Sequence, residues 1–212
     1  DIARTTLRPS DIRELCETVC GTRFCMPEFM LENGKSALTL EGAPRYAVEY
    51  SGKQVSKRGE SVCGDSVSVV KSYDDFFYCF ICDGMGSGED AALTSRMCRV
   101  FLEKMLACGN KKSTTLEMLN NLVCSKSTEC FATVDLLEVD LVLGVASFIK
   151  SGAVPSYIIR DKRLYKIASG TFPIGIVPQV SAEVTEFELE DGDVILLCSD
   201  GVASDIEASE TG

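Results

Sequence analysis

Three aspartates stand where apolar strands are expected to end. Asp65 lies in Gly-Asp-Ser, Asp83 in Asp-Gly-Met-Gly, and Asp200 in Ser-Asp-Gly. Carboxylates at converging strand ends can hold hard ions such as Mg²⁺ or Mn²⁺, which take oxygen ligands and typically use one or two carboxylates each. A glycine after the aspartate lets the backbone approach an ion, so a main-chain carbonyl could be a further ligand. The pattern indicates carboxylate-based metal chemistry.

The composition excludes several other kinds of site. The 212 residues include no histidine, so Ser-His-Asp triads, Cys-His pairs and zinc sites with histidine ligands are ruled out. A formal net charge of -11 disfavours nucleic acid as a partner. We find no apolar run of about 18 residues and no signal pattern. We therefore expect a cytoplasmic chain without membrane contact of its own, although segments outside it could tether the intact protein to the cell membrane.

The eleven cysteines are interpreted as reduced residues, because their number is odd and several lie in apolar runs. A redox or zinc site at Cys79 and Cys82 is the alternative. An offset of three on a strand sends the two side chains to opposite faces, which favours a packing role.

A hairpin is expected to position two of the aspartates. Asp65–Lys71 and Phe76–Cys82 are strand candidates joined by a polar turn. If the turn pivots on Asp74, Asp65 lies directly opposite Asp83. Opposed residues have Cα atoms about 4.5 to 5.5 Å apart, so both carboxylates could reach a shared ion or a pair of ions. Without a cation they would repel each other.

The remaining pattern predicts helices followed by many short strands, which favours antiparallel sheets. The core face of the hairpin should hold Val67, Val69, Phe77, Cys79 and Ile81. Helices are expected at Ser10–Cys20, Glu89–Ala107 and Ser113–Ser125, the last with a capping box of Thr114 and Glu117. Further strands are expected at Tyr46–Tyr50, Phe131–Val139, Leu141–Ile149, Ser156–Ile159, Leu164–Ile167, Ala182–Leu189 and Val194–Cys198.

A glycine-rich segment follows Asp83, but it does not fit a phosphate loop. Glu89 stands where G-x-G-x-x-G needs its last glycine, and no Lys-Ser/Thr follows. We interpret Gly86 and Gly88 as a hinge between a metal-binding strand and a helix that can move.

Taken together, the motifs resemble those of the metal-dependent serine/threonine protein phosphatases (PPM class, type 2C), most closely the phosphatase domain of the stage II sporulation protein E family. The resemblance runs from about Tyr46 to Gly201 in the family's order. It is carried by Ser61–Ser66, Cys82–Gly88, Ala132–Leu136, Ser151–Ser156, Phe172–Ile176 and Cys198–Gly201.

The resemblance implies an α+β fold, an α-β-β-α sandwich of two antiparallel sheets flanked by helices. It also implies two Mn²⁺ or Mg²⁺ ions at one end of the sandwich. Asp65 and Asp83 would bind or bridge them, Gly84 would give its carbonyl to one, and Asp200 would bind the other. A metal-activated water would then hydrolyse phosphoserine. Lys57 or Arg58 could steer the phosphate, although a solvated loop charge is the simpler interpretation.

The resemblance further implies a role in sporulation control. The substrate would be a serine-phosphorylated anti-anti-sigma factor of the STAS class, and the hinge at Gly86 and Gly88 would belong to a helical switch. A homodimer through the switch helices is an open option. We expect residues 1–45 to be the tail of an upstream regulatory or linker region, and residues 46–212 to be the phosphatase domain. The family's closing Asp-Asp-x-Thr motif does not occur before Gly212, so this domain is expected to lack its last segment. The alternative function is a catalytically weak switch module that binds a phosphoprotein.

Overall fold

The computed structural model describes residues 7–32, 34–56, 62–71, 75–86, 88–126, 130–179 and 182–204. The chain divides into two units. One comprises Asp1–Ala47 with Leu141–Leu143, and the other comprises Val48–Asp140 with Gly144–Gly212. The expected regulatory and catalytic roles of the two parts of the chain remain predictions.

The first unit contains one helix and one hairpin. Helix α1 (Pro9–Cys20) begins one residue before the expected start. Its N-terminus is capped by Asp11, whose carboxylate accepts the Arg8 N–H at 3.0 Å, and it ends at Gly21 with a φ of 67°. Strands β1 (Glu28–Glu32) and β2 (Lys35–Thr39) pair antiparallel. No strands were expected in this part of the sequence, so the hairpin is an addition to the prediction.

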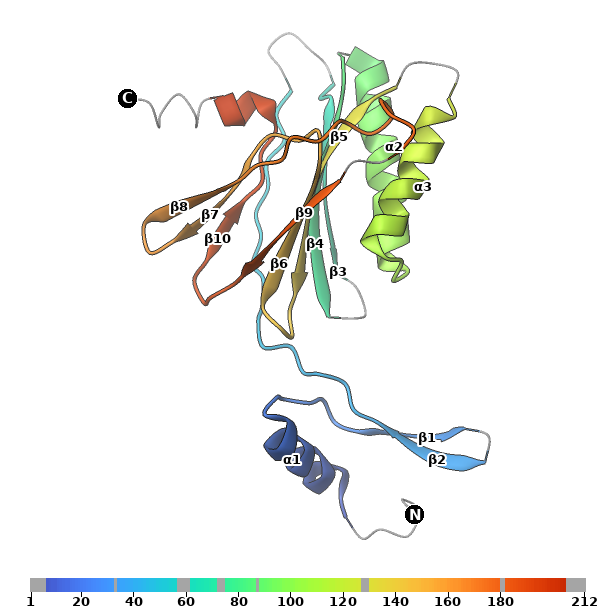
Figure 1. The fold of residues 1–212 in the computed structure, drawn as a ribbon, viewed down its shortest axis with the longest axis vertical. Helices are drawn as coiled ribbons and strands as arrows, with labels where there is room; N and C mark the ends of the chain where they lie inside the picture. The colour runs from blue at the N-terminus through green and yellow to red at the C-terminus, as the bar shows by residue number, and fades with distance from the viewer. Residues whose placement is uncertain are drawn as a thin grey trace. The chain divides into compact units, whose positions relative to one another are not determined.

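The second unit is built on two antiparallel sheets (Figure 1). The five-stranded sheet has the order β3-β4-β5-β6-β9, and the three-stranded sheet has the order β10-β7-β8. The strands are β3 (Asp65–Lys71), β4 (Phe76–Gly84), β5 (Ala132–Asp140), β6 (Val145–Ser151), β7 (Ser156–Arg160), β8 (Arg163–Ile167), β9 (Glu183–Glu188) and β10 (Val194–Leu196).

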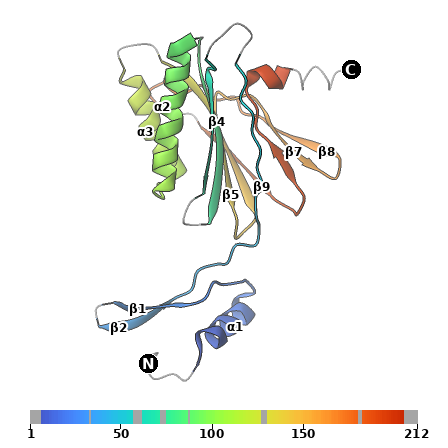
Figure 2. The ribbon, with the colours of Figure 1, turned by 180° about the vertical axis from the view of Figure 1, so that it is seen from behind.

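Helices α2 (Gly88–Ala107) and α3 (Lys112–Cys124) cover the face of the five-stranded sheet that points away from the three-stranded sheet (Figures 1 and 2). Cys98, Leu102 and Leu106 recur at helical spacing along α2 and are fully buried. They pack in one core with side chains of the central strands, including Phe80 and Leu136. The expected class of antiparallel sheets flanked by helices is confirmed.

Burial on strand β4 is more extensive than the hairpin pattern indicated. Phe77 and Ile81 are buried as expected. The expected core residues Val67, Val69 and Cys79 are only partly buried. Tyr78, Phe80 and Cys82 on the opposite face are buried as well, because α2 and α3 cover that face. The strand therefore lies in the middle of the layers and contributes to two interfaces.

Several expected elements differ in the structure. Residues 46–50 lie in no strand, so alternation of apolar residues did not suffice to predict one there. Residues 141–144 form a turn, so β6 begins only at Val145. Helix α3 begins at Lys112, with Lys111 as an N-cap that makes no side-chain hydrogen bond, and the expected capping box is not formed.

The cysteines are free, as expected, but only some of them are core residues. Cys82, Cys98 and Cys198 are buried, whereas Cys20, Cys108 and Cys124 are exposed. Within the described ranges, the helices are too short or too polar to cross a membrane.

Candidate metal centre

Strands β3 and β4 bring Asp65 and Asp83 directly opposite each other. The pairing has the predicted register, with Ser66 opposite Cys82 as the next pair. Beyond the ladder, the Gly84 N–H donates to the Gly64 carbonyl at 3.3 Å. A shift of one residue would turn one carboxylate to the other face, so the register itself builds this acidic pair.

The electrostatics of the pair favour a positive ion. The pKa of Asp83 is raised from 3.8 to about 7, chiefly by burial and also by the charge and hydrogen bond of Asp65 and the charge of Asp200. A divalent ion would compensate this accumulation of negative charge, so the three carboxylates fit the expected cofactor. In the described parts of the chain, no three acidic or cysteine side chains already lie close enough to hold one ion.

Gly84 offers an oxygen ligand at the same place. A Cβ atom built on Gly64 would lie 3.8 Å from the Gly84 carbonyl oxygen and 3.9 Å from Asp83 Oδ1, so both oxygens border one small space. A Cβ atom on Gly84 itself would overlap the backbone of Ala91 in α2. Glycine is therefore required where strand β4 passes under the first turn of the helix.

Asp200 follows strand β10 of the other sheet, and its local structure differs from the expectation. Strand β10 ends at Leu196, before the expected Cys198, and Asp200 begins a short helical segment. The Ser199 carbonyl accepts the N–H groups of Val202 and Ala203, which fixes that turn. Asp200 is exposed, and its charge is felt at Asp83.

The remaining expected site residues have mixed outcomes. Gly86 and Gly88 both adopt positive φ, 108° and 76°, and α2 begins at Gly88. Their role as a switch remains a prediction. Arg58 lies outside the described residues, and so does Lys57 beside it.

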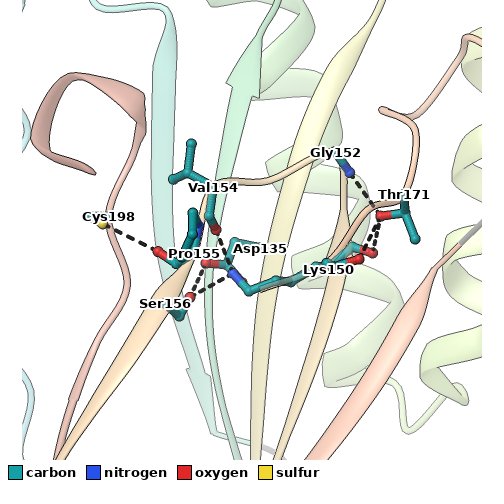
Figure 3. A network of polar contacts seen from close by, with 9 residues as sticks. Asp135, Lys150, Gly152, Val154, Pro155, Ser156, Thr171 and Cys198 are labelled. Atoms are coloured by element: carbon teal, nitrogen blue, oxygen red, sulfur yellow. Dashed lines mark hydrogen bonds and ion pairs between the residues drawn. The ribbon is translucent and has the colours of Figure 1, made fainter. Parts of the chain in front are cut away.

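Sequence reasoning missed a buried ionic network between the two sheets (Figure 3). Lys150 on β6 and Asp135 on β5 are 1% and 2% exposed, and Lys150 Nζ lies 2.8 Å from Asp135 Oδ1. The same ammonium donates to Ser156 Oγ at 2.7 Å and to the Val154 carbonyl at 2.8 Å. Ser156 Oγ in turn donates to Asp135 Oδ2 at 2.5 Å. A lysine directly after the apolar residues Phe148 and Ile149 of β6 was the signal that could have revealed the network.

This network borders the segment that leads to Asp200. Cys198 Sγ donates to the Pro155 carbonyl at 3.6 Å, next to the Val154 carbonyl that accepts from Lys150 (Figure 3). The loop between β6 and β7 is therefore held by the ion pair and contacts the residue two positions before Asp200.

The fold and the acidic site define a protein of the type 2C phosphatase class. The structure of the PP2C phosphatase domain with a fragment of the regulatory domain of SpoIIE from Bacillus subtilis matches 93% of this chain and 60% of that chain, with a TM-score of 0.75 and 27% identity. The fold is also similar to that of RsbX in complex with magnesium, with a TM-score of 0.56 and 22% identity over 66% of this chain and 68% of that chain.

The stage II sporulation protein E family matches residues 74–211, and the chain belongs to this family. Stage II sporulation protein E of Bacillus subtilis is 31% identical over 171 residues, which is 80% of this chain. The chain spans about a fifth of that relative's length (21%). The SpoIIE phosphatase fold predicted from the motifs is thus confirmed.

Proposed function

We propose that the protein is a metal-dependent serine/threonine phosphatase that removes phosphate from a phosphoserine protein in sporulation control. The observation that carries the proposal is the pair of opposed carboxylates of Asp65 and Asp83, together with the high pKa of Asp83. Family membership supports the same activity.

The acidic residues would hold the metal ions that the reaction needs. Asp65 and Asp83 would hold the ions between them, with the Gly84 carbonyl on one side and Asp200 on the other. Two Mn²⁺ or Mg²⁺ ions, when bound, would activate water and neutralise the phosphate charge. The chain has no histidine to protonate the leaving serine oxygen, so that proton would come from water.

The proposal includes the partner and the regulation. The substrate would be a serine-phosphorylated anti-anti-sigma factor of the STAS class. Gly86 and Gly88 would let α2 and α3 move as a switch that controls metal binding, and a homodimer could form through these helices. The overlap between Gly84 and Ala91 that any side chain would cause supports such coupling, because a movement of α2 would be felt directly at the strand end.

The test uses the native full-length protein and a serine-phosphorylated anti-anti-sigma factor. Phosphate release should require Mn²⁺ or Mg²⁺. Asp65→Asn and Asp83→Asn should each lower the rate of phosphate release by more than about a hundredfold. Even the loss of a residue that only hydrogen-bonds to a metal ligand lowers metal affinity or activity about tenfold to a hundredfold. Asp191→Asn is the matched control, because Asp191 also precedes a glycine but lies in an exposed turn.

Unchanged turnover in Asp65→Asn would contradict the proposed site. Binding of the phosphoprotein and of Mn²⁺ without turnover in the unaltered protein would contradict the enzyme and favour the switch module.

A further inference from the structure

A cleft of about 290 Å³ lies beside the candidate metal centre. Asp65 and Ser66 line it from the edge strand β3, Gln54 from the segment before that strand, and Arg96 and Arg99 from α2. The Gln54 side-chain amide donates to the Asp65 carbonyl at 2.5 Å, which holds the preceding segment at the edge of the sheet. The cleft therefore begins at a proposed metal ligand and carries two cationic side chains.

The packing of α2 on β3 puts these arginines along one line. Ser95 Oγ lies 3.1 Å from Ser66 Oγ, and Ser68 Oγ donates to Glu103 Oε1 at 2.5 Å. The helix thus runs beside the strand from its Asp65 end onward. Ala92, Arg96 and Arg99 share a helix face by their spacing of four and three residues, and all three line the cleft.

The two arginines differ in what neutralises them. Arg99 forms an ion pair with Glu103 on the next turn of α2. Arg96 is exposed, and it makes no hydrogen bond or ion pair with any other residue in the described parts of the chain. In a chain with a formal net charge of -11, Arg96 is a positive charge beside the acidic site that is open to an anionic ligand.

The position of Arg96 sets which part of a substrate it could meet. Ala91 lies next to Gly64 at the metal-centre end, where a Cβ on that glycine would be 3.8 Å from the Ala91 Cβ. Arg96 follows five residues later, about 7.5 Å further along the helix at about 1.5 Å per residue. An extended peptide covers that distance in about two residues.

We propose that this cleft is a specificity subsite in which Arg96 binds an acidic side chain about two residues from the phosphoserine of the substrate. The inference rests on the proposed phosphatase function and adds the class of sequence that it selects. The phosphoserine would occupy the metal centre, and the flanking carboxylate would lie between β3 and α2.

The experiment uses the full-length protein with Mn²⁺ and two phosphoserine peptides. One carries glutamates on both sides of the phosphoserine, two residues away, and the other carries glutamines at the same positions. Arg96→Gln should raise the KM of the glutamate peptide about fivefold more than that of the glutamine peptide, the effect of one partly exposed ion pair. Lys104→Gln is the matched control, since it removes an exposed charge from the last turn of the same helix. It should change both KM values alike.

An equal loss with both peptides in Arg96→Gln would show that the arginine contacts the phosphate or acts on the metal centre, and would overturn the subsite. If Lys104→Gln raised the KM of the glutamate peptide selectively, as Arg96→Gln should, the effect would come from the overall charge of the protein. That result would also overturn the subsite. The phosphatase proposal fails if the unaltered protein hydrolyses neither these peptides nor the phosphorylated anti-anti-sigma factor. Fluorescence anisotropy with the same peptides and variants then decides the subsite, which stands only if the glutamate peptide binds tighter and Arg96→Gln removes the difference.

Discussion

Lys150→Met should destabilise the second unit severely. The ammonium of Lys150 is 1% exposed and lies 2.8 Å from Asp135 Oδ1, and Asp135 is 2% exposed. Burial lowers the pKa of Lys150 and raises that of Asp135, and the charge of each partner opposes the effect of burial on the other. Methionine fills a similar volume but leaves a buried carboxylate with only Ser156 as a hydrogen-bond donor in the network.

The magnitude follows from which groups lose a partner. Removing one member of a buried ion pair costs about 3 to 5 kcal/mol, because the remaining charge is left without compensation. Asp135→Leu should cost about as much for the same reason. The double variant removes both charges, so its loss should be smaller than the sum of the two single losses by about 2 kcal/mol or more.

The assay is urea unfolding of the metal-free protein, followed through the transition of the second unit. The midpoint should fall strongly in each single variant, with the slope unchanged. Lys112→Met is the control, since the Lys112–Glu138 pair has a similar N–O distance of 2.6 Å but side chains that are 27% and 14% exposed. It should cost about 1 kcal/mol or less. If Lys150→Met costs no more than Lys112→Met, or if the single losses simply add, the reasoning about the buried pair is refuted.

Three further predictions concern single positions. Asp83→Asn removes one of two opposed carboxylates, so it should stabilise the metal-free protein by about 1 kcal/mol in thermal unfolding. The same variant should bind Mn²⁺ more weakly in calorimetry. A loss of stability would contradict this prediction. Asp193 accepts hydrogen bonds from Arg160 at 2.8 and 2.6 Å, which hold its pKa below 3.8. Asp193→Asn should therefore cost about 1 to 2 kcal/mol at pH 7, and the difference from the parent in urea unfolding should shrink as the pH falls below 3.8; a loss that does not change with pH would argue against the charge. The Cβ of Gly84→Ala would overlap Ala91, so the variant should displace the first turn of α2 and lower the free energy of unfolding by about 3 kcal/mol. Faster amide exchange confined to that turn would support this prediction, and unchanged exchange would refute it.

Local patterns were sufficient to predict the hairpin that builds the acidic pair. Strand β3 has the predicted bounds, and β4 extends the prediction by two residues, because alternation and a short turn together determine a register. The same reasoning failed at Tyr46–Tyr50 and missed β1 and β2. A strand needs a neighbouring strand as well as a pattern, and the neighbour of an isolated segment is set by tertiary structure.

The acidic pair could be predicted, but the ion pair and the cleft could not. Asp135 and Lys150 are opposed on adjacent strands, yet Ser156 joins them from the other sheet. The separation between the two sheets is not visible in a local pattern. The line of Arg96 beside β3 likewise depends on how α2 docks, which the contact between Ser66 and Ser95 reveals only in three dimensions.

The two acidic groups between the sheets give an independent argument for a metal ion. Asp135 on β5 lies opposite Ile81 on β4, and Asp83 lies two residues after Ile81 on β4. The carboxylates of Asp135 and Asp83 therefore point to the same face of the five-stranded sheet. For Asp135 the chain supplies a lysine on the neighbouring strand. For Asp83 the opposed residue is a second aspartate, and within the described ranges no lysine or arginine pairs with it. One sheet face thus holds a carboxylate with its own cation and, at the end where Gly84 offers a carbonyl, a carboxylate that no lysine or arginine of the described ranges neutralises and whose charge a metal ion would balance.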